Sequence, residues 1–300
     1  MTLVKMHADE LEINAALIRR LLSSQFPRWS HLSLSPVSSS GTDHALLRLG
    51  EEMVVRLPRI HWATAQATLE RKWLPRLAPH LPLAVPEQLA IGEPGEGYPW
   101  PWAIYRWLDG ENAVGSPHAD TIASAVALAQ FIRALQAADP TGGPAADASS
   151  GGRGAPLISR DAKTRRAIAE SRELVDTAAV TAAWETALRA PPHNGPPVWI
   201  HGDLEPGNLI MRDGRLSAVI DFCCLCLGDP AGDLIPAWSV FTGEARAAFR
   251  HTLDVDDGAW ARGKGWALST AIIALPYYKE TNPTLAGGAR RKIEAILNES

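Results

Sequence analysis

The stretch from residue 198 to residue 233 constrains the fold more than any other part of the chain. It reads VWIHGDLEPGNLIMRDGRLSAVIDFCCLCLGDPAGD. The dipeptide Asp213-Gly214 is a two-residue turn signal, and the runs 209–211 and 216–220 on either side of it are apolar and β-prone. The pattern predicts an antiparallel hairpin, preceded by a short strand over 198–200.

A two-residue turn also sets which residues lie opposite each other in the hairpin. The expected pairs are Arg212 with Arg215, Ile210 with Ser217, and Asn208 with Val219. Because side chains alternate faces along a strand, Asn208 and Asp221 are predicted to point the same way, roughly 7–8 Å apart. Their side-chain oxygens could then share one cation.

The polar residues of this stretch suggest a division of labour. Magnesium takes one or two protein oxygen ligands together with substrate phosphates, which suits Asn208 and Asp221. Asp203, in the irregular segment before the hairpin, is left to accept a proton from a hydroxyl group. Each residue alone is more typical of a satisfied turn, but the three together favour a site.

These residues carry a resemblance to a known family. The sequence from His201 to Asn208, HGDLEPGN, resembles the catalytic loop of the aminoglycoside phosphotransferase family, small-molecule kinases related in fold to protein kinases. Asp221-Phe222-Cys223 stands where those kinases place the DFG motif, and the run 228–234 is similar to the family's GDPxxDL pattern. The resemblance is strong over these residues and weaker over the rest of the chain.

The resemblance implies a fold and an activity. The fold would be α+β and two-lobed, protein-kinase-like, with a small antiparallel-sheet lobe over 1–107 and a larger, mostly helical lobe over 108–300. The enzyme would move the γ-phosphoryl of ATP or GTP to a hydroxyl of a small molecule. Asp203 would be catalytic, and Asn208 and Asp221 would hold Mg²⁺. His201 would brace the loop, and Asp229 and Asp233 would be scaffold residues.

The first lobe should contain five strands, a first helix and a second helix. The expected strands are 32–37, 45–49, 53–57, 88–91 and 102–107, and the helices are 8–22 and 62–77. By resemblance, nucleotide contacts would come from the first hairpin loop, from a charged pair and from a hinge that meets the purine edge: Ser39, Ser40, Gly41, Thr42, Arg56, Glu70, Tyr105 and Trp107. Arg56 replaces the family's usual Lys. A plain hairpin loop, surface charges and core aromatics are the alternatives.

The second lobe should be helical outside the hairpin. A helix is expected to start at Ser116-Pro117, with further helices over 161–174, 178–190, 234–250, 258–275 and 283–297. The low-complexity run 140–156 is expected to be mobile, either a linker or part of a substrate lid. By resemblance, late residues would line the acceptor pocket: Asp254, Asp256, Asp257, Tyr277, Tyr278 and Glu280. Solvated helix ends would explain the same acidic residues.

Charge and composition narrow the partners. The net charge of −4 over 300 residues argues against nucleic acid, and we expect no membrane segment, a cytoplasmic location and a monomer. Residues 1–107 carry 11 basic and 10 acidic side chains, whereas 108–300 carry 18 and 23. The acidic second part favours an aminated acceptor of the aminoglycoside type, and hence an antibiotic-resistance enzyme. The three crowded cysteines favour buried free thiols over a zinc site.

Two other functions remain open at this stage. The first alternative is a kinase of a macrolide or of a choline-like metabolite. Relatives with this fold accept such molecules, and the fold does not fix the acceptor. A catalytically silent nucleotide-binding module is the second alternative. It draws on Arg56 and on Cys223, which replaces a glycine and cannot adopt a positive φ cheaply.

Overall fold

The structure is a computed structural model that describes residues 11–37, 43–147 and 150–299. The chain forms two compact units. Unit 1 comprises Met1–Ala78 and Val85–Asp109, and unit 2 comprises Pro79–Ala84 and Gly110–Ser300. In the described part of the chain, no helix is both long enough and apolar enough to span a membrane.

Unit 1 is built on an antiparallel five-stranded sheet with the strand order β1-β2-β3-β5-β4. Its strands are β1 (Leu34–Pro36), β2 (His44–Leu49), β3 (Met53–Pro58), β4 (Gln88–Gly92) and β5 (Trp102–Arg106). Burial alternates along β2, as expected for a strand with one face toward a core. All five predicted strands are therefore confirmed, with ends shifted by a few residues.

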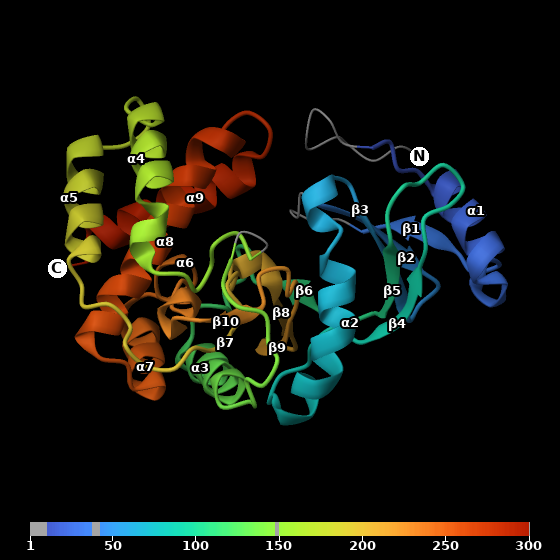
Figure 1. Cartoon of the computed structure of the whole chain (residues 1–300), viewed down its shortest axis with the longest axis horizontal. Helices are drawn as coiled ribbons and strands as arrows, with labels where there is room; N and C mark the ends of the chain where they lie inside the picture. The colour runs from blue at the N-terminus through green and yellow to red at the C-terminus, as the bar shows by residue number, and fades with distance from the viewer. Residues whose placement is uncertain (1–10, 38–42, 148–149, 300) are drawn as a thin grey trace. The chain divides into compact units, whose positions relative to one another are not determined.

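Two helices cover the two faces of this sheet (Figure 1). Helix α1 (Ala15–Gln25) packs into the core that contains Trp102 and Ile104. Helix α2 (Gln66–Leu77) contributes Ala67 to a second cluster, with Ala103 and Tyr105. Because alternate residues of β5 belong to the two clusters, the helices lie on opposite faces. Both helices begin later than predicted: Asn14 caps α1 by accepting from Leu17 N, and a 3-10 turn precedes α2.

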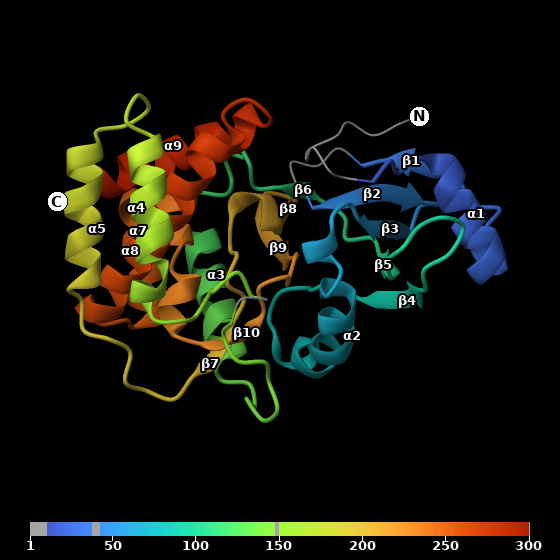
Figure 2. The ribbon, with the colours of Figure 1, turned by 45° about the horizontal axis from the view of Figure 1, so that its top comes forward.

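Unit 2 is mostly helical, and its longest helix, α8, packs against α4, α5 and α9 (Figure 2). The helices are α3 (Ile122–Gln136), α4 (Asp161–Glu170), α5 (Thr177–Leu188), α6 (Pro236–Ser239), α7 (Gly243–Leu253), α8 (Asp257–Tyr278) and α9 (Pro283–Leu297). Short 3-10 helices across the two units are η1 (Pro27–Trp29), η2 (His61–Ala63), η3 (Ala78–His80), η4 (Leu157–Arg160), η5 (Pro206–Asn208) and η6 (Pro230–Asp233).

Two helix predictions for unit 2 were wrong. Helix α3 does not start at Ser116-Pro117, because Thr121 is its N-cap and accepts a hydrogen bond from Ser124 N. The single helix expected over 234–250 is broken into α6 and α7, and Gly243 at the break has a φ of +44°. The hydrophobic periodicity of the sequence revealed neither the later start of α3 nor the break between α6 and α7.

Five short strands position the loops of unit 2. β7 (Val198–Ile200) pairs with β10 (Cys226–Gly228), while β6 (Glu111–Asn112), β8 (Leu209–Arg212) and β9 (Arg215–Val219) form a second sheet. The described part of the 140–156 run packs against the first pair: Ala145 bridges Leu227, and Gly154 O accepts from Asp229 N. A Cβ on Gly228 would lie 2.6 Å from Gly154 Cα. These described residues form packed structure, contrary to the expected mobile segment.

The predicted hairpin is present, but most of its predicted register was wrong. Arg212 pairs with Arg215 as expected, whereas Ile210 lies opposite Ala218 and Leu209 lies opposite Val219. A β-bulge between Ile210 and Met211 leaves Ser217 as the extra residue, and its hydroxyl donates to Ile210 O. Asn208 consequently ends η5 rather than pairing with Val219.

Candidate active site

The segment His201–Asn208 leads from β7 to β8 and is anchored by a buried carboxylate. Asp233 accepts hydrogen bonds from His201 N at 2.8 Å and from Gly202 N at 2.7 Å. Burial raises the pKa of Asp233 to about 7, while the two N–H bonds act in the opposite direction. The predicted scaffold role of Asp233 is confirmed, because its carboxylate holds the start of the loop.

The His201 side chain braces the loop from within. Its Nε2 lies 3.0 Å from Ile220 O, and Asp203 N donates to its Nδ1 at 3.2 Å. Nε2 therefore carries the proton in this arrangement. Burial lowers the pKa of His201 to about 4, so the ring is neutral near pH 7. The bracing role predicted for His201 is confirmed.

Gly202 allows the chain to pass close to its neighbours. Its φ is +80°, and a Cβ there would lie 2.9 Å from Cys224 Cβ and 3.0 Å from Arg153 Cβ. Any side chain at this position would be strained and would also collide with neighbouring atoms. The glycine thus permits Arg153 and Cys224 to lie directly against the loop.

Both oxygens of the Asp203 carboxylate have partners. Asn208 Nδ2 donates to Asp203 Oδ2 at 3.1 Å, and Arg153 Nη2 lies 3.2 Å from Asp203 Oδ1. Burial raises the pKa of Asp203 to about 6, and the charge of Arg153 opposes that rise. A carboxylate with a pKa near 6 is ionised at neutral pH and suited to accept a proton.

Asn208 and Asp221 offer oxygens that fit a hard cation. Asn208 turns its Nδ2 toward Asp203, also donating to Asp203 O at 2.8 Å, so its Oδ1 remains as an acceptor. Asp221 lies close enough to Asp203 to raise its pKa. Among the described residues, no group of three or more His, Cys, Asp or Glu could hold a metal. An oxygen pair of this kind suits Mg²⁺ completed by phosphate oxygens.

The backbone strain in the DFG-like segment lies at Asp221, whose φ is +68°. Aspartate tolerates this left-handed region better than most residues. Cys223 is not among the described residues with positive φ. The absence of a glycine at position 223 therefore does not impose the strain that the sequence suggested.

Sequence reasoning missed two cations beside the loop. Lys292, from α9, is buried and ion-pairs with Glu205 of the His201–Asn208 segment. Arg153 reaches Asp203 from the 140–156 run, although the two residues are 50 positions apart in the sequence. A lone arginine among glycines carries no local signal, because only the packing of this run on β7 and β10 brings it to Asp203.

In unit 1, the structure contains the predicted ion pair of Arg56 and Glu70, with Arg56 Nη1 at 3.5 Å from Glu70 Oε1. Glu70 is fully buried and also accepts from Gln66 Nε2 at 2.7 Å and from the Tyr105 hydroxyl. Arg56 Nη2 donates to Gln66 Oε1 at 3.0 Å. This network fixes the side chain of Arg56 on β3.

The predicted hinge residues are engaged within unit 1. Trp107 N donates to Glu52 O at 2.7 Å, and Arg48 stacks over the Trp107 ring at 4.0 Å. Tyr105 belongs to the interior strand β5, and its hydroxyl belongs to the Glu70 network. The predicted phosphate loop, Ser39, Ser40, Gly41 and Thr42, lies outside the described residues.

The acidic residues proposed for the acceptor pocket have structural partners at the turn between α7 and α8. Asp256 caps α8 by accepting from Ala259 N at 2.6 Å, and Asp257 ion-pairs with Arg250. Asp254 ends α7 with a φ of +54°. By contrast, α8 approaches the Lys292–Glu205 ion pair through Thr270, whose hydroxyl oxygen lies 3.5 Å from Lys292 Nζ. Thr270 is roughly 20 Å along the helix from Asp257.

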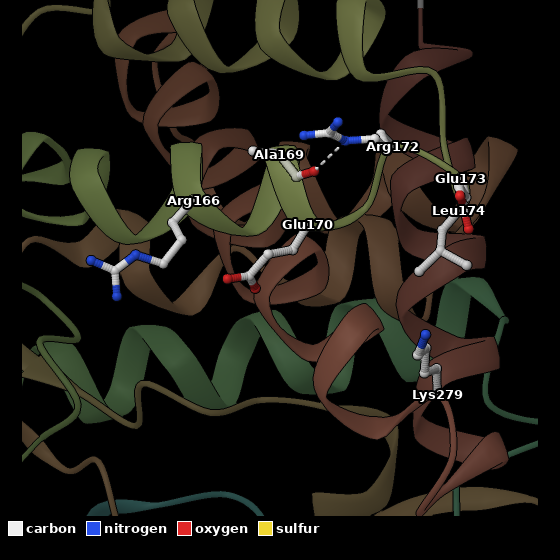
Figure 3. Close-up of a pocket in the computed structure, with 7 residues that line it drawn as sticks. All are labelled: Arg166, Ala169, Glu170, Arg172, Glu173, Leu174 and Lys279. Atoms are coloured by element: carbon white, nitrogen blue, oxygen red, sulfur yellow. Dashed lines mark hydrogen bonds between the residues drawn. The ribbon is translucent and has the colours of Figure 1, made fainter.

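A pocket of about 470 Å³ lies at the C-terminal end of α4 (Figure 3). In the close-up, Arg166 and Glu170 point from α4 to the same side. The pocket is lined by basic, acidic and apolar residues: Arg166, Ala169, Glu170, Arg172, Glu173, Leu174 and Lys279. Sequence reasoning named none of these residues as site residues.

The chain was compared with known proteins of established structure. The GDP and kanamycin complex of APH(2")-IIia superposes with a TM-score of 0.74 at 18% identity, over 94% of this chain and 99% of that one. A macrolide 2'-phosphotransferase from Brachybacterium faecium gives 0.61 at 21% identity, over 96% and 99%. ADP-bound aminoglycoside phosphotransferase APH(2'')-Ib gives 0.57 at 17% identity, over 94% and 98%.

These likenesses confirm the α+β, protein-kinase-like fold. Among curated protein sequences, none matches the chain. The model of the phosphotransferase enzyme family matches residues 33–266, which is more than half of the sequence. The chain belongs to the phosphotransferase enzyme family.

Proposed function

We propose that the chain transfers the γ-phosphoryl group of ATP or GTP to a hydroxyl of a small molecule, with Asp203 as the catalytic base. The observation that carries the proposal is the environment of Asp203: a partly buried carboxylate held by Asn208 and Arg153, with a pKa of about 6. Such a group can take a hydroxyl proton at neutral pH and cannot be explained as a solvated turn residue.

The transfer follows from the residues around it. Asp203 takes the proton of the acceptor hydroxyl as its oxygen bonds to the γ-phosphorus, and the bond to the β,γ-bridging oxygen breaks to release the nucleoside diphosphate. Asn208 Oδ1 and the Asp221 carboxylate would hold Mg²⁺, which neutralises phosphate charge. His201 and Asp233 keep the loop rigid during the step.

Unit 1 would supply the remaining nucleotide contacts. Arg56, oriented by Glu70, would bind phosphate oxygens, and the loop Ser39–Thr42 would cover them. Tyr105 and Trp107 would lie near the purine base of the nucleotide. Arg56→Lys tests the geometry of this contact: it keeps the charge but loses the planar fork, and the KM for ATP should rise about tenfold. An unchanged KM would remove Arg56 from the phosphate site.

An aminoglycoside-type acceptor, and with it a role in antibiotic resistance, is the second candidate. The kanamycin complex among the structural neighbours and the acidic composition of residues 108–300 favour it. A macrolide acceptor has comparable support from the macrolide 2'-phosphotransferase. Because all these neighbours are less than 25% identical, their substrates do not decide the acceptor of this chain.

The test is magnesium-dependent transfer of labelled phosphate from ATP and from GTP to a panel of aminoglycosides, macrolides and polyols. Asp203→Asn should abolish transfer while leaving nucleotide binding within twofold. The matched control is Asp213→Asn, the same exchange at an exposed turn, and it should leave transfer unchanged. A silent nucleotide-binding module would show nucleotide binding with no transfer that depends on Asp203.

The metal assignment has its own readout. Asp221→Asn should remove the magnesium dependence of nucleotide affinity, because it halves the proposed pair of protein oxygen ligands. Affinity should be measured by calorimetric titration with and without Mg²⁺. If Asp221→Asn retains the same magnesium-dependent gain in affinity as the unaltered chain, Asp221 is not a ligand.

A further inference from the structure

Three cations of unit 2 lie near one another, and one of them, Arg153, contacts the proposed catalytic base. Arg153 pairs with Asp203, and its guanidinium carbon lies 6.0 Å from the centroid of the Trp266 ring. Arg160, just before α4, lies 5.6 Å from the same centroid. Lys163, one turn further along α4, is close enough to both arginines for their charges to lower its pKa. One indole thus has two guanidinium groups beside it.

Among the described residues, Arg153 is the one member of this cluster with a carboxylate in contact, Asp203. Arg160 donates to two neutral groups, the Ser269 hydroxyl at 3.2 Å and Gly151 O at 3.1 Å. Its pKa falls to about 10, first because of burial and then because of the charge of Arg153. The nearby Glu205 already forms an ion pair with Lys292. Asp203 therefore contacts this cluster through Arg153.

Arg153 also has donor capacity to spare. Its side chain is only 15% exposed, and its Nη1 is buried without a hydrogen-bond partner among the described residues. An unsatisfied buried donor is costly, and a cationic one more so. A donor of this kind either remains unsatisfied at a cost in stability or forms a hydrogen bond with a ligand. The planar guanidinium fork is complementary to a carboxylate or a phosphate.

We propose that Arg153, Arg160 and Lys163 bind an anionic group of the acceptor, a carboxylate or a phosphate ester, beside the hydroxyl that Asp203 deprotonates. The inference rests on the proposed function and specifies its acceptor. It departs from the expectation from net charge, because Asp256 and Asp257 of the α7–α8 turn have other partners while Arg153 contacts Asp203. A cationic group placed against Arg153 would be repelled by its guanidinium.

The placement favours the acceptor over the nucleotide as the source of the anion. Arg153 contacts Asp203, the residue that must meet the acceptor hydroxyl, through Oδ1. The proposed metal ligand Asn208 lies at the other carboxylate oxygen. An anion held by Arg153 Nη1 is therefore adjacent to the base on the side away from Asn208.

The experiment uses four polyols that share a six-carbon chain and differ at one end: D-gluconate, D-glucitol 6-phosphate, D-glucitol and D-glucamine. Their affinities for the full chain, saturated with magnesium and a non-hydrolysable ATP analogue, are measured by calorimetric titration, and transfer is measured with ATP. We expect one of the anionic probes to bind at least tenfold more tightly than D-glucitol, and D-glucamine to bind most weakly. The better anionic probe distinguishes a carboxylate from a phosphate ester.

The variants assign the preference to the cluster. Arg160→Met should weaken the better anionic probe about 10- to 100-fold, the loss of a charge-assisted hydrogen bond, and leave D-glucitol within twofold. Lys163→Glu, on an exposed position of α4, should shrink the ratio of anionic to cationic affinity about tenfold without affecting folding. The control is Arg165→Met, which removes an exposed cation of the same helix that pairs with Asp161 and Glu185.

The outcomes separate this inference from the proposed function. Tighter binding or faster transfer with D-glucamine, no preference among the four probes, or a preference unchanged in Lys163→Glu and Arg160→Met would each overturn the anionic site. A raised KM for ATP in both variants with an unchanged probe ratio would instead assign the cations to the nucleotide and also overturn it. Variant-sensitive anion binding without any transfer dependent on Asp203 would contradict the proposed function and leave the anion site standing.

Discussion

Two arginine–aspartate pairs in the described part of unit 2 differ in how fully their hydrogen-bonding groups are used. Arg262 meets Asp229 through two contacts, at 2.7 and 3.1 Å, and its Nη1 donates to Pro191 O at 2.8 Å. Arg153 meets Asp203 through one contact at 3.2 Å, and its Nη1 has no partner among the described residues. The same residue types therefore form a closed pair and an open one.

The difference teaches how to separate a structural pair from a site. In the closed pair, all donors of Arg262 that point into the protein are satisfied, and Asp229 also caps η6 by accepting from Ala231 N. In the open pair, the aspartate has a raised pKa and the arginine keeps a donor for a ligand. The two pairs differ both in the satisfaction of their hydrogen bonds and in exposure, with side chains 9% and 7% exposed in the closed pair and 15% and 25% exposed in the open one.

The largest effect is expected from Asp203→Asn in the open pair. Transfer should fall about 10³-fold or more, because the amide cannot accept the hydroxyl proton. The free energy of unfolding should change by less than about 1 kcal/mol, since the amide can still accept from Arg153. Steady-state transfer and urea unfolding measure the two quantities. Loss of stability with retained transfer would make this pair structural as well.

The closed pair should respond in the opposite way. Arg262→Met leaves Asp229 as a buried carboxylate without its cation, so the free energy of unfolding should fall by about 3–5 kcal/mol. The double variant Arg262→Met with Asp229→Asn should recover part of this loss. Urea unfolding at pH 7 provides the values. A loss of less than about 1 kcal/mol in the free energy of unfolding would show that the closed pair contributes no more than a surface ion pair.

His201 belongs to the catalytic loop but should behave like the closed pair, because its ring nitrogens both have partners. Its pKa is about 4 in the folded chain and about 6.5 when unfolded. The unfolded chain therefore binds a proton first as the pH falls, and stability present above about pH 6.5 is lost toward pH 4. The loss from this group should approach about 3 kcal/mol.

The contribution of His201 is isolated by comparison with His201→Asn, which cannot titrate. Between pH 6 and pH 4.5, the stability of the unaltered chain should fall more steeply than that of the variant, by about 1.4 kcal/mol per pH unit. Denaturant unfolding across the pH series supplies both slopes. Equal slopes would mean that His201 is protonated inside the fold.

The smallest expected effect on stability is that of Arg153→Met. Removing Arg153 ends its repulsion with Arg160 and allows Asp203 to become protonated, so unfolding should change by about 1 kcal/mol or less. The KM for an anionic acceptor should rise more than kcat falls, and Arg153→Lys should restore part of the affinity. A destabilisation as large as that of Arg262→Met would erase the contrast between the pairs.

Much of the fold could be predicted from local signals. Asp213-Gly214 correctly marked the hairpin, and Asn282-Pro283 correctly marked the start of α9, where Asn282 accepts from Leu285 N. The register failed because a bulge at Ile210 and Met211 depends on neighbours outside the hairpin. Ala84 bonds Ser217 O and Val219 N from far along the chain. No property of residues 209–219 indicates that contact.

The sequence by itself determined the elements, the HGDLEPGN loop and the residue types of the proposed base and metal ligands, because these depend on spacing along a short segment. Only the tertiary structure decided the partners of those residues. Arg153 stands 50 positions from Asp203, while Asp256 forms a helix cap and Asp257 forms an ion pair. Coulomb interactions depend on distance in space, so the charge at a site cannot be read from a composition.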